Sequence, residues 1–320
     1  MKLLFLSFLI ITSIQNLQNK IFGETDNDNN EKITQIVQDQ TFKNGLSVRG
    51  HTTSHPEAIG YLFPFAKNKN IPVWSLAQWG SSKTLSNTSS TTQNDTVIYQ
   101  NEAKRLYFYP ENNGNIRIGL EVNASKEYLK PRQLGEDWIH LLLEQNFTNP
   151  VFLNDIESLN YYIRAKLLFC DNKMNEDYNP DLHTAQITLF VTIQSKNNKS
   201  INEGDFFWFG LPLYDYRYKN IPEYAAEDLG KEDASRKFIY TVAGSQLFQN
   251  SMHSMEWITI DKNIYPLIKN AFKTAQNNGY MKNCTWEDLC ISSMNIGWEV
   301  PGTFDCGIIF DTPSLIAVLK

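Results

Sequence analysis

Residues that mark the common metal and nucleotide sites are scarce in this sequence of 320 residues. It has four cysteines but no C-x-x-C pair, which argues against a structural zinc site. It also contains no G-x-S-x-G elbow, no phosphate-binding P-loop and no glycine-rich dinucleotide turn. No internal repeat is present, which excludes a propeller. Several large enzyme classes are therefore excluded before any residue is considered in detail.

Positive charge and long apolar runs are also lacking. The chain has 29 Lys and Arg against 35 Asp and Glu, a net charge of −6. Nucleic acid is therefore not expected as a partner, because phosphate binding requires clustered Lys and Arg. Beyond the N-terminus no stretch reaches about 18 consecutive apolar residues, so no membrane span is expected.

The first residues have the pattern of a secretory signal peptide. Met1 and Lys2 precede an apolar run from Leu3 to Ile14 that is too short to cross roughly 30 Å of hydrocarbon. We expect a signal peptide over residues 1–20, with an approximate cleavage site, and a secreted or extracellular protein (periplasmic in a bacterium). The alternative, a buried N-terminal element, is disfavoured because the residues that follow are polar and offer no partner.

Composition divides the rest of the chain. Residues 21–45 are charged and Asn-rich and predict a polar linker or arm, and residues 46–320 predict a single β-sandwich domain. The Ser/Thr/Asn-rich stretch 81–95 predicts a long exposed loop. In an oxidising compartment the cysteines can form one or two disulfides. Three pairings are possible, among them Cys284 with Cys290 and Cys170 with Cys306.

Alternation of apolar and polar residues predicts many strands. It covers residues 115–122, 137–145, 161–170, 183–194, 205–217 and 294–300. The segment 205–217 is aromatic on both faces, and Pro212 predicts that this strand is bulged or lies at an edge. Near residues 262–276 the apolar residues instead recur at helical spacing, which predicts one amphipathic helix. The expected fold is mainly β, a two-sheet antiparallel jelly-roll sandwich with this one helix.

The outward faces of these strands carry unusual side chains. Large aromatic residues there alternate with Arg, His and Gln, whereas an ordinary solvated face is rich in Lys, Glu, Ser and Thr. Rings can stack on sugars while charged and amide groups bind hydroxyls. This pattern predicts a concave saccharide groove lined by Arg117, Trp138, His140, Tyr162, Arg164, Gln186 and Trp208. The competing interpretation is that several of these strands belong to the other sheet, or that the charged residues form structural ion pairs.

The alternating pattern of the chain resembles that of the concanavalin A-like jelly-roll superfamily of secreted glycan-active proteins. The aromatic strand FFWFGLPLYDYR and the closing segment IGWEVPGTFDCGIIF carry this resemblance, which covers roughly residues 46–320. The superfamily includes glucanases, polysaccharide lyases and lectins. The E-x-D-x-x-E strand of one glucanase family is missing, and Gln186-Ile187-Thr188 stands where alginate-lyase-like proteins have Gln-Ile-His. The resemblance therefore implies the fold and the substrate class but no catalytic residue.

Two strand carboxylates are the candidate catalytic groups. Glycoside hydrolysis uses a pair of carboxylates, one as acid and the other as nucleophile or base. Glu121 and Glu299 each lie between apolar residues, which can desolvate a carboxylate and raise its pKa. Glu144 is the reserve candidate. The sequence thus favours a glycoside hydrolase, although an isolated strand Glu is more often solvated or paired with Arg.

Three alternatives stay open. The same aromatic face suits a non-catalytic glycan-binding domain of lectin or adhesion type, or the protein is exported and purely structural. A polysaccharide lyase would need a neutralising group and a base, and the candidates are Arg164, Gln186, His140, His183 and Tyr162. His183 falls on an apolar face and is expected to be a core histidine.

No cofactor is expected. The acidic segment 171–181 could hold Ca²⁺ through oxygen ligands, but it lacks the spacing of a calcium loop. His51 and His55 are expected in a loop, because Pro56 argues against a helix that would pair them on one metal.

Overall fold

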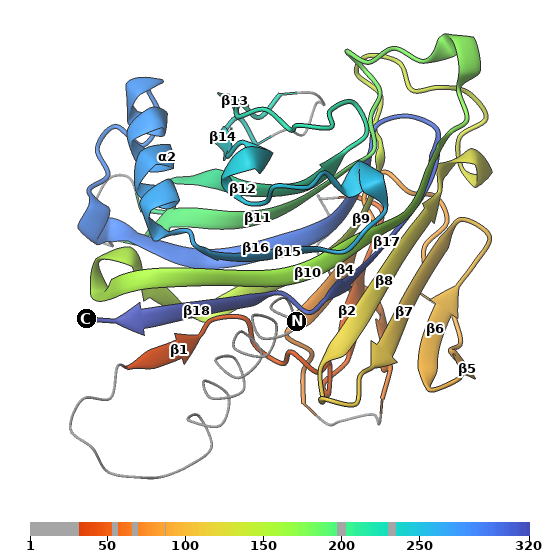
Figure 1. Ribbon diagram of the computed structural model, residues 1–320, viewed down its shortest axis with the longest axis horizontal. Coiled ribbons are helices and arrows are strands. Elements are labelled where there is room, and N and C mark those ends of the chain that lie inside the picture. The colour runs from red at the N-terminus through yellow and green to blue at the C-terminus, as the bar shows by residue number, and fades with distance from the viewer. Residues whose placement is uncertain (1–31, 53–56, 66–69, 87, 197–202, 230–234) are drawn as a thin grey trace, which may run out of the picture. The chain divides into compact units, whose positions relative to one another are not determined.

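The computed structural model describes residues 32–52, 57–65, 70–86, 88–196, 203–229 and 235–320 (Figure 1). The chain divides into a unit of residues 1–32 and a second unit, Ile33–Lys320. The expected signal peptide and His55 lie outside the described residues. The elements below all belong to the second unit.

The first of two large sheets, sheet A, is antiparallel at every pairing. Its strands are, in spatial order, β1 (Ile33–Gln35), β18 (Ser314–Leu319), β10 (Ile156–Asn172), β17 (Phe304–Asp311), β8 (Ile116–Asn123), β7 (Lys104–Pro110), β6 (Thr96–Gln100) and β5 (Thr91–Gln93), while β15 (Ile258–Asn263) pairs with β10.

Sheet B is antiparallel except for the pairs β12–β14 and β2–β4. Its strands are, in order, β13 (Tyr224–Glu227), β14 (Phe238–Thr241), β12 (Phe206–Asp215), β11 (Gln186–Ser195), β16 (Leu289–Val300), β9 (Ile139–Phe152), β4 (Trp74–Ala77), β2 (Leu46–Arg49) and β3 (Ala58–Leu62). The predicted mainly-β sandwich of two sheets is confirmed.

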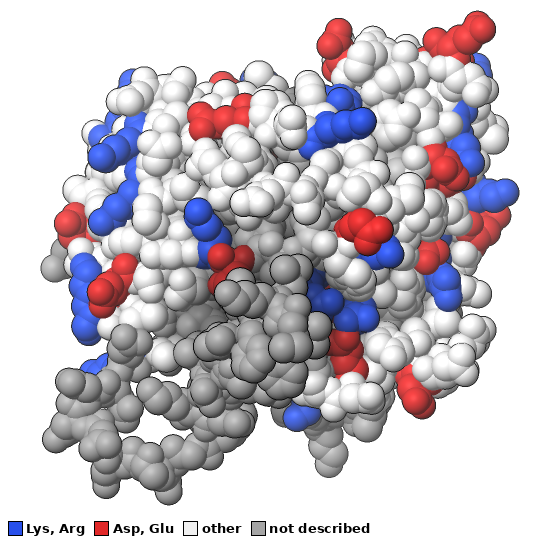
Figure 2. All heavy atoms as spheres, viewed as in Figure 1, with Lys and Arg blue, Asp and Glu red and all other residues white. Residues whose placement is uncertain are grey.

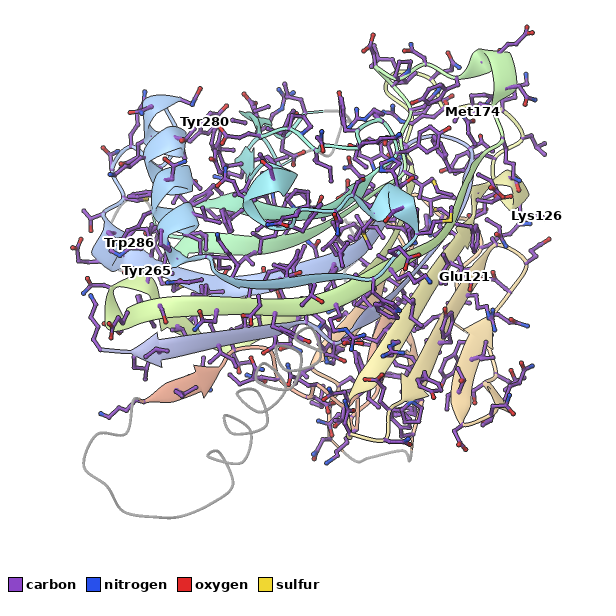
Figure 3. The ribbon with its side chains drawn as sticks, in the orientation of Figure 1. Glu121, Lys126, Met174, Tyr265, Tyr280 and Trp286 are labelled. Carbon is purple, nitrogen blue, oxygen red and sulfur yellow. The ribbon has the colours of Figure 1, made fainter. Side chains whose placement is uncertain are left out.

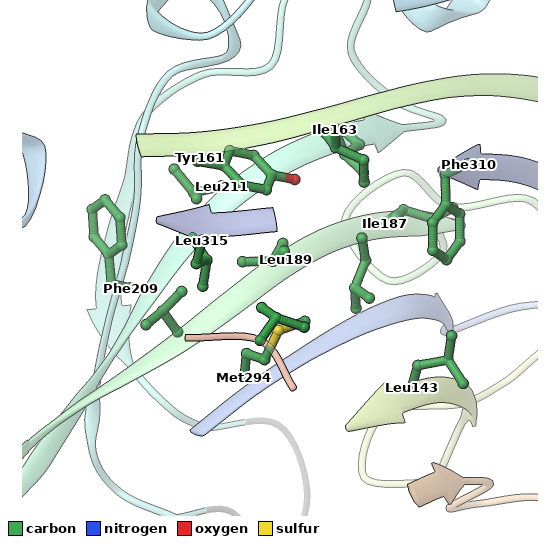
Figure 4. Close-up of a cluster of buried hydrophobic side chains, with 14 of the residues drawn as sticks. Leu143, Tyr161, Ile163, Ile187, Leu189, Phe209, Leu211, Met294, Phe310 and Leu315 are labelled. Carbon is green, nitrogen blue, oxygen red and sulfur yellow. The ribbon is translucent and has the colours of Figure 1, made fainter. Parts of the chain in front are cut away.

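The core fills the space between the two sheets. Period-two alternation sends one apolar set from each strand inward, as Figure 4 shows for Leu143 and Ile187 of sheet B and Ile163 and Phe310 of sheet A. Each of these four side chains is fully buried, and burial of one such side chain contributes about 1.5–3 kcal/mol. We call the opposite side of each sheet its outer face.

The predicted helix is confirmed as α2 (Tyr265–Asn277), the one α-helix among the described residues. Its buried stripe includes Ile268, Ala271 and Phe272, and the Phe272 ring stacks on Phe207 at 6.4 Å between centroids. Phe207 belongs to the inward set of β12, so α2 covers part of the inner side of sheet B. Short 3-10 turns complete the secondary structure: η1 (Ala124–Lys126), η2 (Leu153–Asp155), η3 (Asn175–Asp177), η4 (Gly244–Gln246), η5 (Met252–Ser254) and η6 (Trp286–Asp288).

Some boundaries differ from those expected. The sandwich already includes residues assigned to the 21–45 linker, because β1 pairs with β18 and Phe42 is fully buried. Strand β1 and the buried Phe42 therefore attach this mostly polar stretch to the sandwich. The segment 81–95, expected to be an exposed loop, contains β5. Leu85 of this segment is fully buried. β12 is bulged beside Pro212, as predicted, but it lies inside the sheet and not at an edge.

The expected disulfides are not formed in this structure. All four cysteines are free. Cys170 and Cys306 stand directly opposite each other on β10 and β17. Within the described residues no helix is long and apolar enough to cross a membrane.

A buried ion pair fixes the segment that follows β4. Lys104 and Glu127 are in contact, and their side chains are 0% and 1% exposed. Glu127 also accepts hydrogen bonds from the Ser81 hydroxyl group at 2.8 Å and from the backbone N–H of Ser82 at 2.7 Å. The pair therefore ties the turn at residues 79–83 to sheet A and to η1.

We predict that replacing one member of this pair strongly destabilises the protein. Lys104→Met leaves the Glu127 carboxylate buried without its countercharge, and breaking a buried pair in this way costs about 3–5 kcal/mol. Urea denaturation measures the loss. The matched control is Glu102→Gln, which breaks the exposed Lys83–Glu102 pair and should leave the midpoint nearly unchanged. Equal midpoints for the two variants would contradict this role of the pair.

Candidate functional site

A single row of side chains crosses the outer face of sheet B. In register from strand to strand it contains Tyr61, Ser47, Ser75, Glu144, Asn295, Phe190, Gly210, Thr241 and Tyr224. The tyrosines at both ends are exposed, 54% for Tyr61 and 53% for Tyr224. The middle of the row is occupied by Glu144 and Asn295, from the neighbouring strands β9 and β16.

Glu144 has a strongly perturbed pKa. It is half-buried, and desolvation raises its pKa from 4.5 to about 7, although Arg49 acts in the opposite direction. The neighbours of Glu144 in the row, Ser75 and Asn295, are uncharged, so neither adds charge repulsion to the effect of burial on this pKa. A carboxyl group with this pKa is about half protonated at neutral pH and largely protonated at lower pH, which is the state that a general acid needs.

Asn295 contributes a buried acceptor beside this acid. Its side-chain Oδ1 is shielded from solvent and has no hydrogen-bond partner among the described residues. Because Asn295 and Glu144 are directly opposite each other in an antiparallel pair, their Cβ atoms are about 4.5–5.5 Å apart. A buried polar atom without a partner is rare in folded proteins and marks this position for functional scrutiny.

A second polar row lies nearer to one end of the same face. It contains His140, Glu299, Gln186 and Asp215, on β9, β16, β11 and β12. The Gln186 side-chain amide donates a hydrogen bond of 3.1 Å to Glu299 Oε2. The residue directly opposite Glu299 on β9 is His140.

Two tryptophans pack around His140. The Trp138 ring stacks on the imidazole at 5.5 Å between centroids, and the Trp79 ring meets it edge-on at 5.6 Å. The Arg132 guanidinium lies over the Trp138 ring at 4.7 Å. Gly80, at φ +66°, permits this packing, because a Cβ there would lie 2.0 Å from the Trp138 carbonyl oxygen. The buried Lys104–Glu127 pair holds the same turn.

An uncharged row separates the two polar rows. The row between them contains Ala77, Leu142, Gly297 and Thr188. Gly297 has φ +154°, and a Cβ there would lie 2.1 Å from the Leu141 carbonyl oxygen, so no larger residue fits. Four residues along the strand and one strand spacing place the Cα atoms of Glu144 and Glu299 about 14 Å apart.

Aromatic side chains extend the face beyond the Glu144 row. Trp208 meets Phe190 at 6.4 Å and Phe206 at 5.2 Å, both edge to face. Its indole N–H donates to the Ser235 hydroxyl group at 3.4 Å. Of the predicted site residues, the structure thus places Trp138, His140, Gln186 and Trp208 on one outer face, together with Glu144 and Glu299.

Glu121 does not belong to this face. It lies on β8 of sheet A (Figure 3), where Arg105 is 3.4 Å from its carboxylate. Leu120 and Trp298 point into the core and are joined by a hydrogen bond of 2.9 Å from the indole N–H to the Leu120 carbonyl. Their neighbours Glu121 and Glu299 therefore point to opposite outer faces. The expected pair cannot flank one glycosidic bond, and this expectation is corrected.

Three further predicted site residues also lie on sheet A. Arg117 and Arg164 both contact Asp311, at 3.1 and 3.7 Å, and both guanidinium groups lie over the Trp257 ring. Tyr162 lies on β10, two residues from Arg164. This arrangement corresponds to the structural ion pairs that were the competing interpretation. The expected saccharide groove thus divides between two sheets.

The histidine and metal expectations have different outcomes. His183 is 2% exposed, with its Nε2 2.8 Å from the Arg132 carbonyl oxygen and its Nδ1 accepting from the Asn179 N–H, so it is a core histidine as predicted. No group of three His, Cys, Asp or Glu side chains suited to a metal is found in the described part of the chain, which includes residues 171–181. Figure 2 shows acidic and basic side chains interspersed on the visible surface.

Sequence reasoning missed Asn295, Trp79 and Arg49. Asn295 alternates with apolar residues just as Glu299 does, so it could be placed on an outward face but not beside Glu144. That placement needs the β9–β16 register. Arg49 ends β2 and Trp79 lies in the turn after β4, where no alternation marks them.

Comparison with known proteins finds no matching family model and no matching curated protein. Among solved structures, a family 12 xyloglucanase from Bacillus licheniformis is similar at 12% identity over 72% of this chain and 96% of its own, with a TM-score of 0.39. The xyloglucanase domain of a type three effector from Sinorhizobium fredii is similar at 10% identity over 73% and 100%, with a TM-score of 0.37. The fold itself is defined by the two sheets described above.

The raised pKa of Glu144 predicts a pH dependence of stability. The folded pKa lies above the ordinary 4.5, so the stabilising contribution of the protonated group is complete below about pH 4.5 and is lost as pH rises through about 7. At about 1.4 kcal/mol for each pKa unit, the difference is roughly 3 kcal/mol. Glu144→Gln, which mimics the protonated form, should match the wild type at pH 4 and exceed its stability at pH 8.

Denaturant unfolding at both pH values measures this difference. Glu157→Gln, at an exposed position of β10, is the control and should follow the wild type at each pH. If Glu144→Gln also follows the wild type, Glu144 is not desolvated as described.

Proposed function

We propose that this protein is carbohydrate-active and that it binds a glycan on the outer face of sheet B. The observation that carries the proposal is the gathering of two carboxylates, an imidazole and an amide with several aromatic rings on one face. Aromatic rings supply flat apolar contact, and the polar groups between them can bind hydroxyls. The N-terminal apolar run supports the further proposal that the protein is exported to reach an extracellular glycan.

The chemistry that best suits this face is glycoside hydrolysis by Glu144 and Glu299. Glu144, with a pKa of about 7, protonates the leaving oxygen, and Glu299, held by Gln186, activates water as the base. The Cα atoms of the two residues lie about 14 Å apart, a spacing that is closer to the wide carboxyl separation of an inverting pair, about 6.5–9.5 Å, than to the 5–5.5 Å of a retaining pair. The proposed outcome is therefore inversion at the anomeric carbon.

A non-catalytic glycan-binding domain is the second candidate. One observation favours it: the residues directly beside Glu299 are His140 and Gln186, and neither is a carboxylate. A lyase receives less support, because Arg164 and Tyr162 of its candidate set lie on sheet A and only His140 and Gln186 remain on this face.

We predict that Glu144→Gln and Glu299→Gln each lower the rate of polysaccharide hydrolysis by about 10²–10⁴-fold, as expected for loss of an acid or a base. The wild-type rate should fall as pH rises through about 7, where Glu144 loses its proton. Reducing-end release from a panel of neutral and acidic polysaccharides measures the rate. Proton NMR of the first product identifies the anomer formed.

Glu121→Gln is the matched control, because Glu121 lies on the opposite outer face and should leave turnover unchanged. Loss of turnover in Glu121→Gln, or full turnover in both other variants, would contradict the assignment. If the wild type binds a glycan of the panel without cleaving any, the binding function replaces the hydrolase.

A further inference from the structure

Directly opposite Glu144, the Asn295 side chain carries a polar atom that no described residue satisfies. Asn295 Oδ1 is buried, and no side chain or backbone group of the described residues donates to it. Glu144 stands directly opposite on β9 and is the nearest side chain in the row on that side. An unsatisfied buried acceptor costs about 1–3 kcal/mol unless a donor is present. A protonated carboxyl group is such a donor, whereas a carboxylate only accepts.

Few charged groups surround Glu144 on the adjoining strands. Along β9 its neighbours on the same face are Leu142 and Asn146, and along β16 they are Ser293 and Gly297. On β4 it faces Ser75. Arg49, on β2, is the charged group that acts on it electrostatically, and this effect favours the carboxylate. Glu299 and His140 lie four residues further along the two strands.

We propose that Asn295 accepts a hydrogen bond from the protonated carboxyl group of Glu144 and thereby holds the acid proton in place on the outer face of sheet B. Asn295 is then a positioning residue. It fixes the orientation of the proton-bearing oxygen and opposes the effect of Arg49. The consequence for hydrolysis rests on the proposed function, but the hydrogen bond itself does not.

The opposite orientation of the amide makes the opposite prediction. If the Asn295 –NH₂ group faced Glu144, it would donate to the carboxylate and favour the charged form. Removing the side-chain amide would then raise the pKa of Glu144. With Oδ1 facing the acid, removing the amide lowers that pKa. The sign of one shift therefore distinguishes the two arrangements.

Carbon-13 NMR titration of the Glu144 carboxyl group in the full-length protein provides the test. Asn295→Leu keeps the volume and the dry surroundings but removes the acceptor. We expect the midpoint to fall by about half a unit to one unit, the equivalent of one ordinary hydrogen bond. Asn146→Leu, two residues from Glu144 on the same face, is the control and should leave the midpoint unchanged. An unchanged or raised midpoint in Asn295→Leu overturns the proposal.

A second measurement needs no variant and covers the case in which Asn295→Leu fails to fold. In the wild type, the Asn295 side-chain carbonyl carbon should titrate with the same midpoint as Glu144, because its hydrogen bond is lost when the acid ionises. A carbonyl signal that does not move through that pH range overturns the proposal. Neither measurement uses a glycan, so the hydrogen bond can be verified even if no polysaccharide is cleaved and the hydrolase proposal fails.

Discussion

The pairing of β9 with β16 is the constraint on which the candidate site depends. Side chains alternate between the two faces of a strand, so a slip of one residue would exchange the inner and outer sets. The inner set includes Leu141 and Leu143 on β9 and Ile296 and Trp298 on β16, all fully buried. Exposing them would cost several kcal/mol in lost burial. The core therefore fixes which polar residues meet outside: Glu144 with Asn295, and His140 with Glu299.

The same sandwich creates two environments for charged groups. In the interior, Lys104 and Glu127 lie with their side chains fully or almost fully buried and satisfy each other, and they hold the turn that carries Trp79 and Gly80. On the outer face, Glu144 has no such partner in its row, and burial raises its pKa so that it keeps its proton up to about pH 7. A desolvated carboxyl group is thus neutralised by an ion pair in one place and by protonation in the other. Only the second arrangement leaves a proton available for chemistry.

The local sequence pattern was sufficient to predict the strands and the helix, but not to predict which strands lie side by side. The strands and the helix could be predicted because alternation and helical spacing are properties of a few consecutive residues, as in β10 and α2. Glu121 and Glu299 look alike in that pattern, since each follows a buried apolar residue and precedes another. Their separation depends on which strands share a sheet, and that is decided by long-range pairing. For the same reason Asn295 could be placed outward but not beside Glu144.

We propose the outer face of sheet B as the ligand face. Proton–nitrogen NMR of the tryptophan indoles tests it most directly, because these groups occur on both outer faces and in the core. During titration with soluble glycan oligosaccharides, the signals of Trp208, Trp138 and Trp79 should shift. The signal of Trp257, which lies between Arg117 and Arg164 by sheet A, and those of the buried Trp74 and Trp298 should not. A shift of Trp257 with no change at Trp208 and Trp138 would contradict the account.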